Sequence, residues 1–140
     1  MPRYTASREL LAPRADVWAF LSEPYHLPDW WPGLGGVQPD RRGFVPGARW
    51  QIQAGERPSL LRRPGAAGII LIRAVERERR LAFQLVAERV DAELELEDAG
   101  PKRTLATLTV EAPFFSSVNR KTPVRALSRL YALCQTAAEI

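Results

Sequence analysis

Few side chains in this sequence have the chemistry of a catalytic or metal-binding group, and none of them forms a clear constellation. The only histidine, His26, and the only cysteine, Cys134, are far apart in the chain. Their single occurrence excludes two-histidine metal sites, cysteine-based zinc sites and an internal disulfide. A histidine could act as a general acid or base, but no predicted partner orients His26, which favours a surface or capping role over acid–base catalysis. We therefore predict no metal and no cofactor.

Polar side chains inside predicted strands are the second possible source of chemistry, because they could fix a carbonyl or carboxylate of a bound molecule. These candidates are Arg49, Gln51, Arg73, Gln84 and Thr107. Arg73 is the preferred candidate for a charged side chain that points into a pocket, although alternation along its strand does not decide which way it points. Near the C-terminus, Tyr131 could bring a hydroxyl to a ligand, whereas Cys134 is interpreted as a small buried apolar residue.

Composition indicates one ordinary globular domain over residues 1–140, with 46% hydrophobic and 26% charged residues. No apolar run approaches the roughly 20 residues of a membrane span, and the first residues lack a signal peptide's apolar core. We therefore expect a cytoplasmic protein with no transmembrane segment. The net charge of +4 comes almost entirely from arginine. Nucleic-acid binding is not expected, because the chain has neither a recognisable motif nor a basic run with interleaved aromatic residues.

The elements that would position these side chains are mostly short strands. Apolar alternation and β-branched residues predict strands at 3–10, 34–38, 48–54, 69–76, 81–88, 90–98 and 103–112. The stretch 90–98 alternates most cleanly, as expected for an antiparallel sheet with one wet face. A short helix is predicted at 14–22, and Pro28 suits the start of another helical turn.

The last segment, about 118–140, predicts one long helix with an unusually wide apolar band. One apolar row consists of Val124, Leu127, Tyr131, Cys134 and Ala138, and a second of Ala126, Leu130, Leu133 and Ala137. The polar face holds Arg125, Arg129, Thr136 and Glu139. Such a band implies burial on two sides, or one side that borders a partly empty cavity. We expect the cavity on the Tyr131 side.

Four stretches resemble the START-like helix-grip (SRPBCC) superfamily of the polyketide cyclase/dehydrase type. They are 11–23, which resembles the family's first helix, then 30–32, 45–47 and 76–83. The resemblance implies an α+β helix-grip fold, in which a seven-stranded curved antiparallel sheet wraps around a long C-terminal helix. It also implies two short helices after the first strand, and a deep apolar pocket for a hydrophobic small molecule.

Three functions follow as hypotheses. The first is binding or carrying a lipid- or polyketide-like molecule between the sheet and the helix. Its expected contacts are Trp30, Trp50, Ile52, Arg73, Phe83, Leu127, Tyr131 and Cys134. The alternative is a polyketide cyclase or dehydratase that uses Arg73, Tyr131 or His26, with no catalytic residue assigned. The third is an interaction module built on the basic loop at 57–63, within the long loop 55–67. The oligomeric state stays open.

Overall fold

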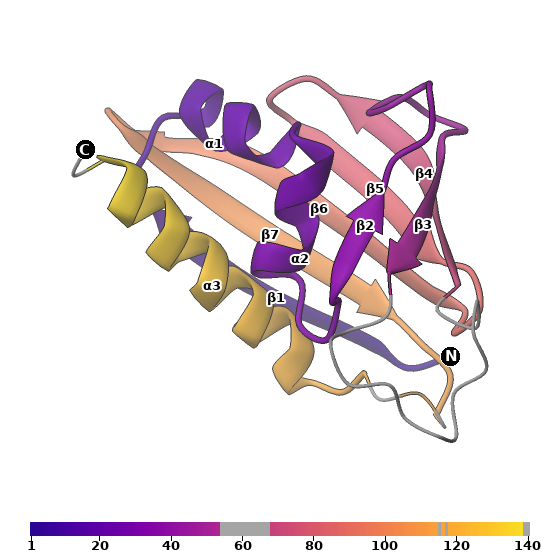
Figure 1. The fold of residues 1–140 in the computed structure, drawn as a ribbon. Coiled ribbons are helices and arrows are strands. Elements are labelled where there is room, and N and C mark those ends of the chain that lie inside the picture. The colour runs from indigo at the N-terminus through magenta and orange to yellow at the C-terminus, as the bar shows by residue number, and fades with distance from the viewer. Residues whose placement is uncertain (54–67, 115, 117, 139–140) are drawn as a thin grey trace.

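A seven-stranded antiparallel sheet curves around a long C-terminal helix in the computed structural model of the chain (Figure 1). The structure describes residues 1–53, 68–114, 116 and 118–138. The predicted α+β helix-grip architecture, with its short helices after the first strand, is therefore confirmed. The basic loop at 55–67, on which the interaction hypothesis rested, lies outside the described residues.

The strands and helices follow one another in the predicted order. The strands are β1 Arg3–Leu10, β2 Gly36–Gln38, β3 Arg49–Gln53, β4 Ile69–Glu76, β5 Arg80–Leu85, β6 Val90–Gly100 and β7 Arg103–Glu111. The helices are α1 Arg14–Leu21, the 3₁₀ turn η1 Pro24–His26, α2 Leu27–Trp30 and α3 Lys121–Ala138. In space the strands lie in the order β1-β7-β6-β5-β4-β3-β2, so the sheet is open and β1 and β2 form its edges.

The two faces of the sheet differ sharply in polarity. In β6 the alternate residues Val90, Ala92 and Leu94 are buried on the inner face. Asp91 and Glu93 occupy the outer face, where they form ion pairs with arginines of β4 and β5. This division follows from the side-chain period of two, which sends every second residue to the helix-covered side.

A bulge in β4 decides the direction of Arg73. Ile72 pairs with Phe83 and Ala74 pairs with Ala82, so Arg73 is the extra residue between two regular stretches. Arg73 lies on the outer face, where its Nη1 is 2.9 Å from Asp91 Oδ1 and its side chain is 52% exposed. The expectation that Arg73 points into the space between sheet and helix was therefore wrong.

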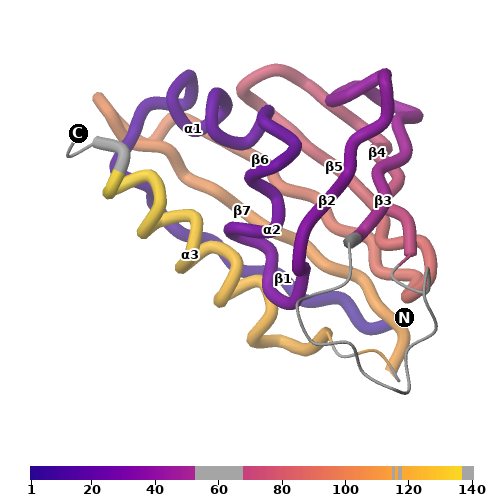
Figure 2. The backbone as a smooth tube through the Cα atoms, viewed as in Figure 1, coloured from indigo at the N-terminus to yellow at the C-terminus, as the bar shows by residue number. Residues whose placement is uncertain are grey.

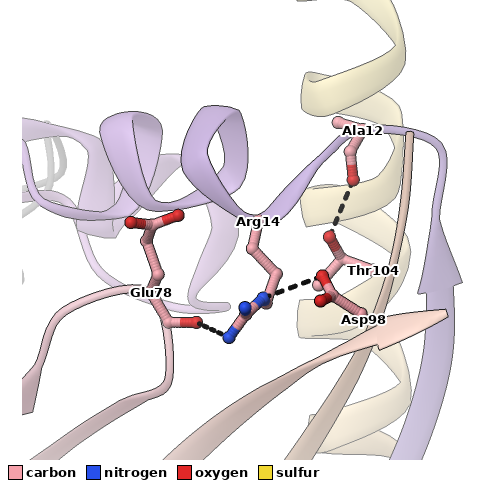
Figure 3. Close-up of polar contacts among 5 residues, drawn as sticks. All are labelled: Ala12, Arg14, Glu78, Asp98 and Thr104. Carbon is pink, nitrogen blue, oxygen red and sulfur yellow. Dashed lines mark hydrogen bonds and ion pairs between the residues drawn. The ribbon is translucent and has the colours of Figure 1, made fainter. Parts of the chain in front are cut away.

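Polar contacts connect the start of α1 to the turn between β4 and β5 and to β6 near its end (Figure 3). Arg14 forms a 2.9 Å ion pair from Nε to Asp98 Oδ1 and donates from Nη1 to the Glu78 carbonyl at 3.4 Å. Thr104 is fully buried, and its hydroxyl donates a 2.7 Å hydrogen bond to the Ala12 carbonyl. These contacts fix where the chain leaves β1 and enters the helix.

Helix α3 packs across β1 and β7, with α2 beside it (Figure 2). Ala126, Leu127, Leu130 and Cys134 form its buried face. The Tyr131 flank borders the edge strand β1 and extends outward to Val124, which is 54% exposed. No helix among the described residues is long and apolar enough to cross a membrane.

Candidate ligand-binding site

Three aromatic rings fill much of the space between α2 and the inner face of the sheet. The Trp31 and Phe83 ring centres are 5.3 Å apart, and the Trp30 ring lies 6.1 Å from Trp31 and 6.3 Å from Phe83. All three pairs meet edge to face, the arrangement that aromatic quadrupoles favour. All three side chains are almost completely buried. Both adjacent tryptophans are buried because the chain leaves the helix at Trp31, with φ −85° and ψ 121°.

A second aromatic group lies toward the β3 side of the core. The Trp50 indole donates a 2.8 Å hydrogen bond from Nε1 to the Gly43 carbonyl. The Phe44 ring lies 6.0 Å from Trp50 and 5.8 Å from Trp18. Ile52 is half-buried and packs against the same core. The hydrogen bond of Trp50 and the ring contacts of Phe44 are made within this group. We therefore interpret the group as part of the packed core.

An opening of about 330 Å³ lies beside the first aromatic group, at the N-terminal end of α3. Its walls come from the loop after α2, the end of β5 with the turn that follows it, and the start of α3 with the residues before it. The lining residues are Trp31, Pro32, Gly33, Leu34, Leu85, Glu88, Val118, Asn119, Thr122, Arg125 and Arg129. Its volume is at the lower end of the range for small-molecule sites, roughly 300–1,000 Å³.

The opening combines an apolar floor with a charged rim. Trp31 and Leu85 are buried in the core, and each also borders the opening. Arg125 and Arg129 are exposed on α3, and Glu88 is exposed on the turn after β5. Concave sites with apolar walls and a few polar groups suit amphiphilic small molecules.

The predicted ligand contacts are distributed over five places. Trp30 and Phe83 meet in the aromatic group beside the opening, and Leu127 and Cys134 lie on the buried face of α3. Trp50 and Ile52 lie on β3, Tyr131 borders β1, and Arg73 is on the outer face of the sheet. None of the eight lines the opening.

Sequence reasoning did not assign to the site the residues that form its apolar floor and its cationic rim, namely Trp31, Leu85, Arg125 and Arg129. The helical pattern correctly predicts both arginines on the polar face of α3, but it does not indicate that this face borders an opening. The available signal was Pro32-Gly33, which predicts a turn directly after the tryptophan pair.

Two candidate chemical groups are held away from the opening. Burial, with a smaller contribution from the Asp16 charge, raises the pKa of the Cys134 thiol to about 11, so the thiol stays protonated and unreactive near neutral pH. His26 Nδ1 lies 2.8 Å from the Phe20 carbonyl oxygen, and its ring stacks on Phe20 at 4.2 Å. His26 therefore fixes the turn between α1 and α2.

A second depression, of about 360 Å³, lies on the outer face of the sheet. It is bordered by the ion pairs Arg73–Asp91, Arg80–Glu93 and Arg3–Glu111. The hydrogen bond from Arg80 lowers the pKa of Glu93, which keeps that carboxylate ionised. Charged groups that already satisfy one another make this surface a poor match for an apolar ligand.

Solved structures with the same fold share little sequence with this chain. A Thermobifida fusca protein has a TM-score of 0.72 at 17% identity, with 97% of this chain and 95% of that chain covered. The Bacillus cereus protein XoxI has a TM-score of 0.66 at 14% identity, with 99% of each chain covered. A point mutant of norcoclaurine synthase from Thalictrum flavum has a TM-score of 0.63 at 16% identity, with 98% and 96% covered.

Sequence comparison provides the family. A search of curated proteins gives no match. A family model described as polyketide cyclase / dehydrase and lipid transport matches residues 1–134, nearly the whole length. The predicted resemblance to this group, which came from the stretches 11–23, 30–32, 45–47 and 76–83, is confirmed. The chain belongs to the polyketide cyclase / dehydrase and lipid transport family.

Proposed function

We propose that this protein binds a hydrophobic small molecule of lipid- or polyketide-like character at the opening between the sheet and α3. The observation that carries the proposal is the position of Trp31. Its ring is only 2% exposed, yet it forms a wall of an opening of about 330 Å³. A large aromatic surface at the boundary between a core and an opening provides an apolar contact for a ligand.

The bound molecule would lie on Trp31, Leu34, Leu85 and Val118, which are the larger apolar residues of the lining. Deeper entry would require the rings of Trp30, Trp31 or Phe83 to turn, because all three are packed edge to face. The family description, which includes lipid transport, supports binding or carriage.

An enzyme of the cyclase or dehydratase type is the alternative. The family description includes this chemistry, and one structural neighbour is a synthase by name. However, Arg73, Tyr131 and His26, the three polar groups expected to support such chemistry, are all outside the lining. An enzyme at this opening would have to use another group, such as Glu88. Binding is therefore the preferred function.

Uptake of a neutral apolar fluorophore, N-phenylnaphthylamine, by the purified full chain tests the proposal. We expect saturable fluorescence enhancement that Trp31→Leu weakens by several-fold. Val124→Ala, which truncates an exposed apolar side chain of α3 outside the lining, should leave uptake unchanged. Native mass spectrometry of the protein before and after mild organic extraction would identify a co-purified ligand. Absence of saturable uptake by extracted protein would overturn the proposal.

A further inference from the structure

We infer that the ligand carries a carboxylate, and that Arg125 and Arg129 at the rim of the opening bind it. This inference rests on the proposed function, because it assigns the polar end of the molecule whose apolar part lies on Trp31 and Leu85. The relevant observation is a pair of cations next to an apolar wall, both lining the same opening.

The spacing of the two arginines brings their charges together. Residues four apart lie one turn apart on the same helix face, so both guanidinium groups extend from α3 toward the same rim. Like charges at this spacing repel one another. A bound anion would remove this repulsion, whereas a neutral ligand would not.

Among the described residues, Arg125 and Arg129 lack the acidic partners that six other arginines have. Six arginines make ion pairs with acidic side chains at 4.0 Å or less: Arg3, Arg14, Arg73, Arg77, Arg80 and Arg103. Within the part of the chain that the structure describes, no acidic side chain lies within that distance of Arg125 or Arg129. Among these described residues, no ion pair therefore competes with a ligand for the guanidinium donors of Arg125 and Arg129.

The charged side chains of the described lining have a positive balance, which favours the binding of an anion. Glu88 is the only acidic residue among the described residues of the lining, which also include two arginines. Two neutral side-chain oxygens of the lining already accept hydrogen bonds: Asn119 Oδ1 accepts from the Lys121 amide at 2.8 Å, and Thr122 Oγ1 accepts from the Asn119 amide at 3.1 Å. The arginines are the lining's cationic hydrogen-bond donors.

A carboxylate fits this arrangement better than a neutral or cationic head group. Its planar pair of oxygens matches the fork of guanidinium donors and is commonly bound in two parallel hydrogen bonds. An apolar wall beside such a group selects an amphiphilic acid: an aliphatic or aromatic body with one carboxylate. An amine of the same length would meet repulsion from two cations and attraction from Glu88 alone.

Displacement of bound N-phenylnaphthylamine by decanoate, decanol and decylamine, all below their micellar concentrations, separates these possibilities. In the unmodified full chain we expect decanoate to bind about tenfold more tightly than decanol, and decylamine to bind most weakly. In Arg125→Gln/Arg129→Gln, decanoate affinity should fall about tenfold, while decanol affinity stays within about twofold. The matched control is Arg77→Gln/Arg103→Gln, which removes two arginine charges outside the opening.

The outcomes distinguish the inference from the proposed function. Equal binding of decanoate and decanol, or a decanoate affinity that the rim variant leaves unchanged, overturns the carboxylate inference while apolar binding stands. If the control variant loses as much decanoate affinity as the rim variant, the effect comes from net charge alone, and the inference is also overturned. Failure of all three probes, together with absent fluorophore uptake, overturns both. Thermal midpoints of both double variants confirm that the proteins compared are folded.

Discussion

The guanidinium carbon of Arg8 on β1 lies 4.2 Å from the centre of the Tyr131 ring on α3. Arg8 Nη1 also donates a 3.1 Å hydrogen bond to Ser128 Oγ on the same helix. Arg8 is an inward-facing charged residue on the edge strand β1, and both of these partners lie on α3, which crosses that strand. The contact attaches α3 to the edge of the sheet, on a different flank from the opening that Arg125 and Arg129 border.

Replacing Tyr131 by leucine keeps apolar bulk but removes the aromatic face under Arg8. We expect the free energy of unfolding to fall by about 0.5–1 kcal/mol, the value of an exposed cation–π contact. A double-mutant cycle with Arg8→Met, followed by urea denaturation, measures the coupling. Ligand uptake by Tyr131→Leu should be normal, and a loss of uptake would place the ligand on the Tyr131 side instead.

Substitutions at two buried tryptophans should have different consequences. Trp50→Phe leaves the Gly43 carbonyl without its indole donor, so we expect a loss of about 1–3 kcal/mol in unfolding free energy with fluorophore uptake retained. Trp31→Leu should lower both stability and uptake, because Trp31 packs on Phe83 and also lines the opening. Parallel urea denaturation and fluorophore titration of the two variants test this; equal loss of uptake would contradict it.

Thr104→Val replaces a buried hydroxyl by a methyl group of similar shape. The Ala12 carbonyl then loses the hydroxyl donor seen in Figure 3, and we expect a cost of about 1–3 kcal/mol in chemical denaturation. Thr104→Ser keeps the hydroxyl and serves as the control. If Thr104→Val unfolds at the same denaturant concentration as the unmodified chain, the hydrogen bond to Ala12 does not stabilise the fold.

Cys134 should make stability depend on alkaline pH. Burial raises the pKa of its thiol from 9.0 to about 11, so the folded state holds the proton more tightly than the unfolded state. The resulting stabilisation is complete below pH 9 and is lost as the pH rises from 9 to 11. Urea midpoints of the unmodified chain and Cys134→Ala should therefore converge over this interval. A pH-independent difference would show that the thiol titrates normally.

Asp40 should make the stability of the fold depend on pH in the acid range. The backbone amide of Arg49, followed by those of Arg42 and Gly43, lowers the pKa of the Asp40 carboxyl from 3.8. A lowered pKa stabilises the fold above pH 3.8, and this contribution disappears as the pH falls through and below that value. Thermal midpoints of Asp40→Asn should lie below those of the unmodified chain at pH 6 and approach them at low pH. The exposed Glu97→Gln is the control.

Most of the fold could be predicted because alternation is a local signal. The β6 pattern follows directly from valine, alanine and leucine alternating with acidic residues, and the odd Arg8 on the apolar side of β1 does face α3. The bulge in β4 could not be predicted, because Ile69–Ile72 is apolar on both faces and either direction of Arg73 was compatible with the composition of the strand.

The candidate site was harder to predict because it depends on which flank of α3 faces which neighbour. The wide apolar band correctly predicted that Leu127 and Cys134 are buried, but the cavity expected on the Tyr131 side is instead an opening bordered by Arg125 and Arg129. That choice is made by tertiary contacts, namely Arg8 on β1 and Trp31 after α2. Local periodicity carries no information about either contact.

The bulge at Arg73 also bears on how chain length can vary in this fold. If residue 73 were absent, Ile72 opposite Phe83 and Ala74 opposite Ala82 would become consecutive pairs of a regular antiparallel ladder. Ile72 and Val75 would keep the faces they now occupy, whereas a one-residue deletion within Ile69–Ile72 would turn part of the core strand outward. Position 73 is thus a place where a residue can be gained or lost between relatives, and alignments across β4 should accept a gap there.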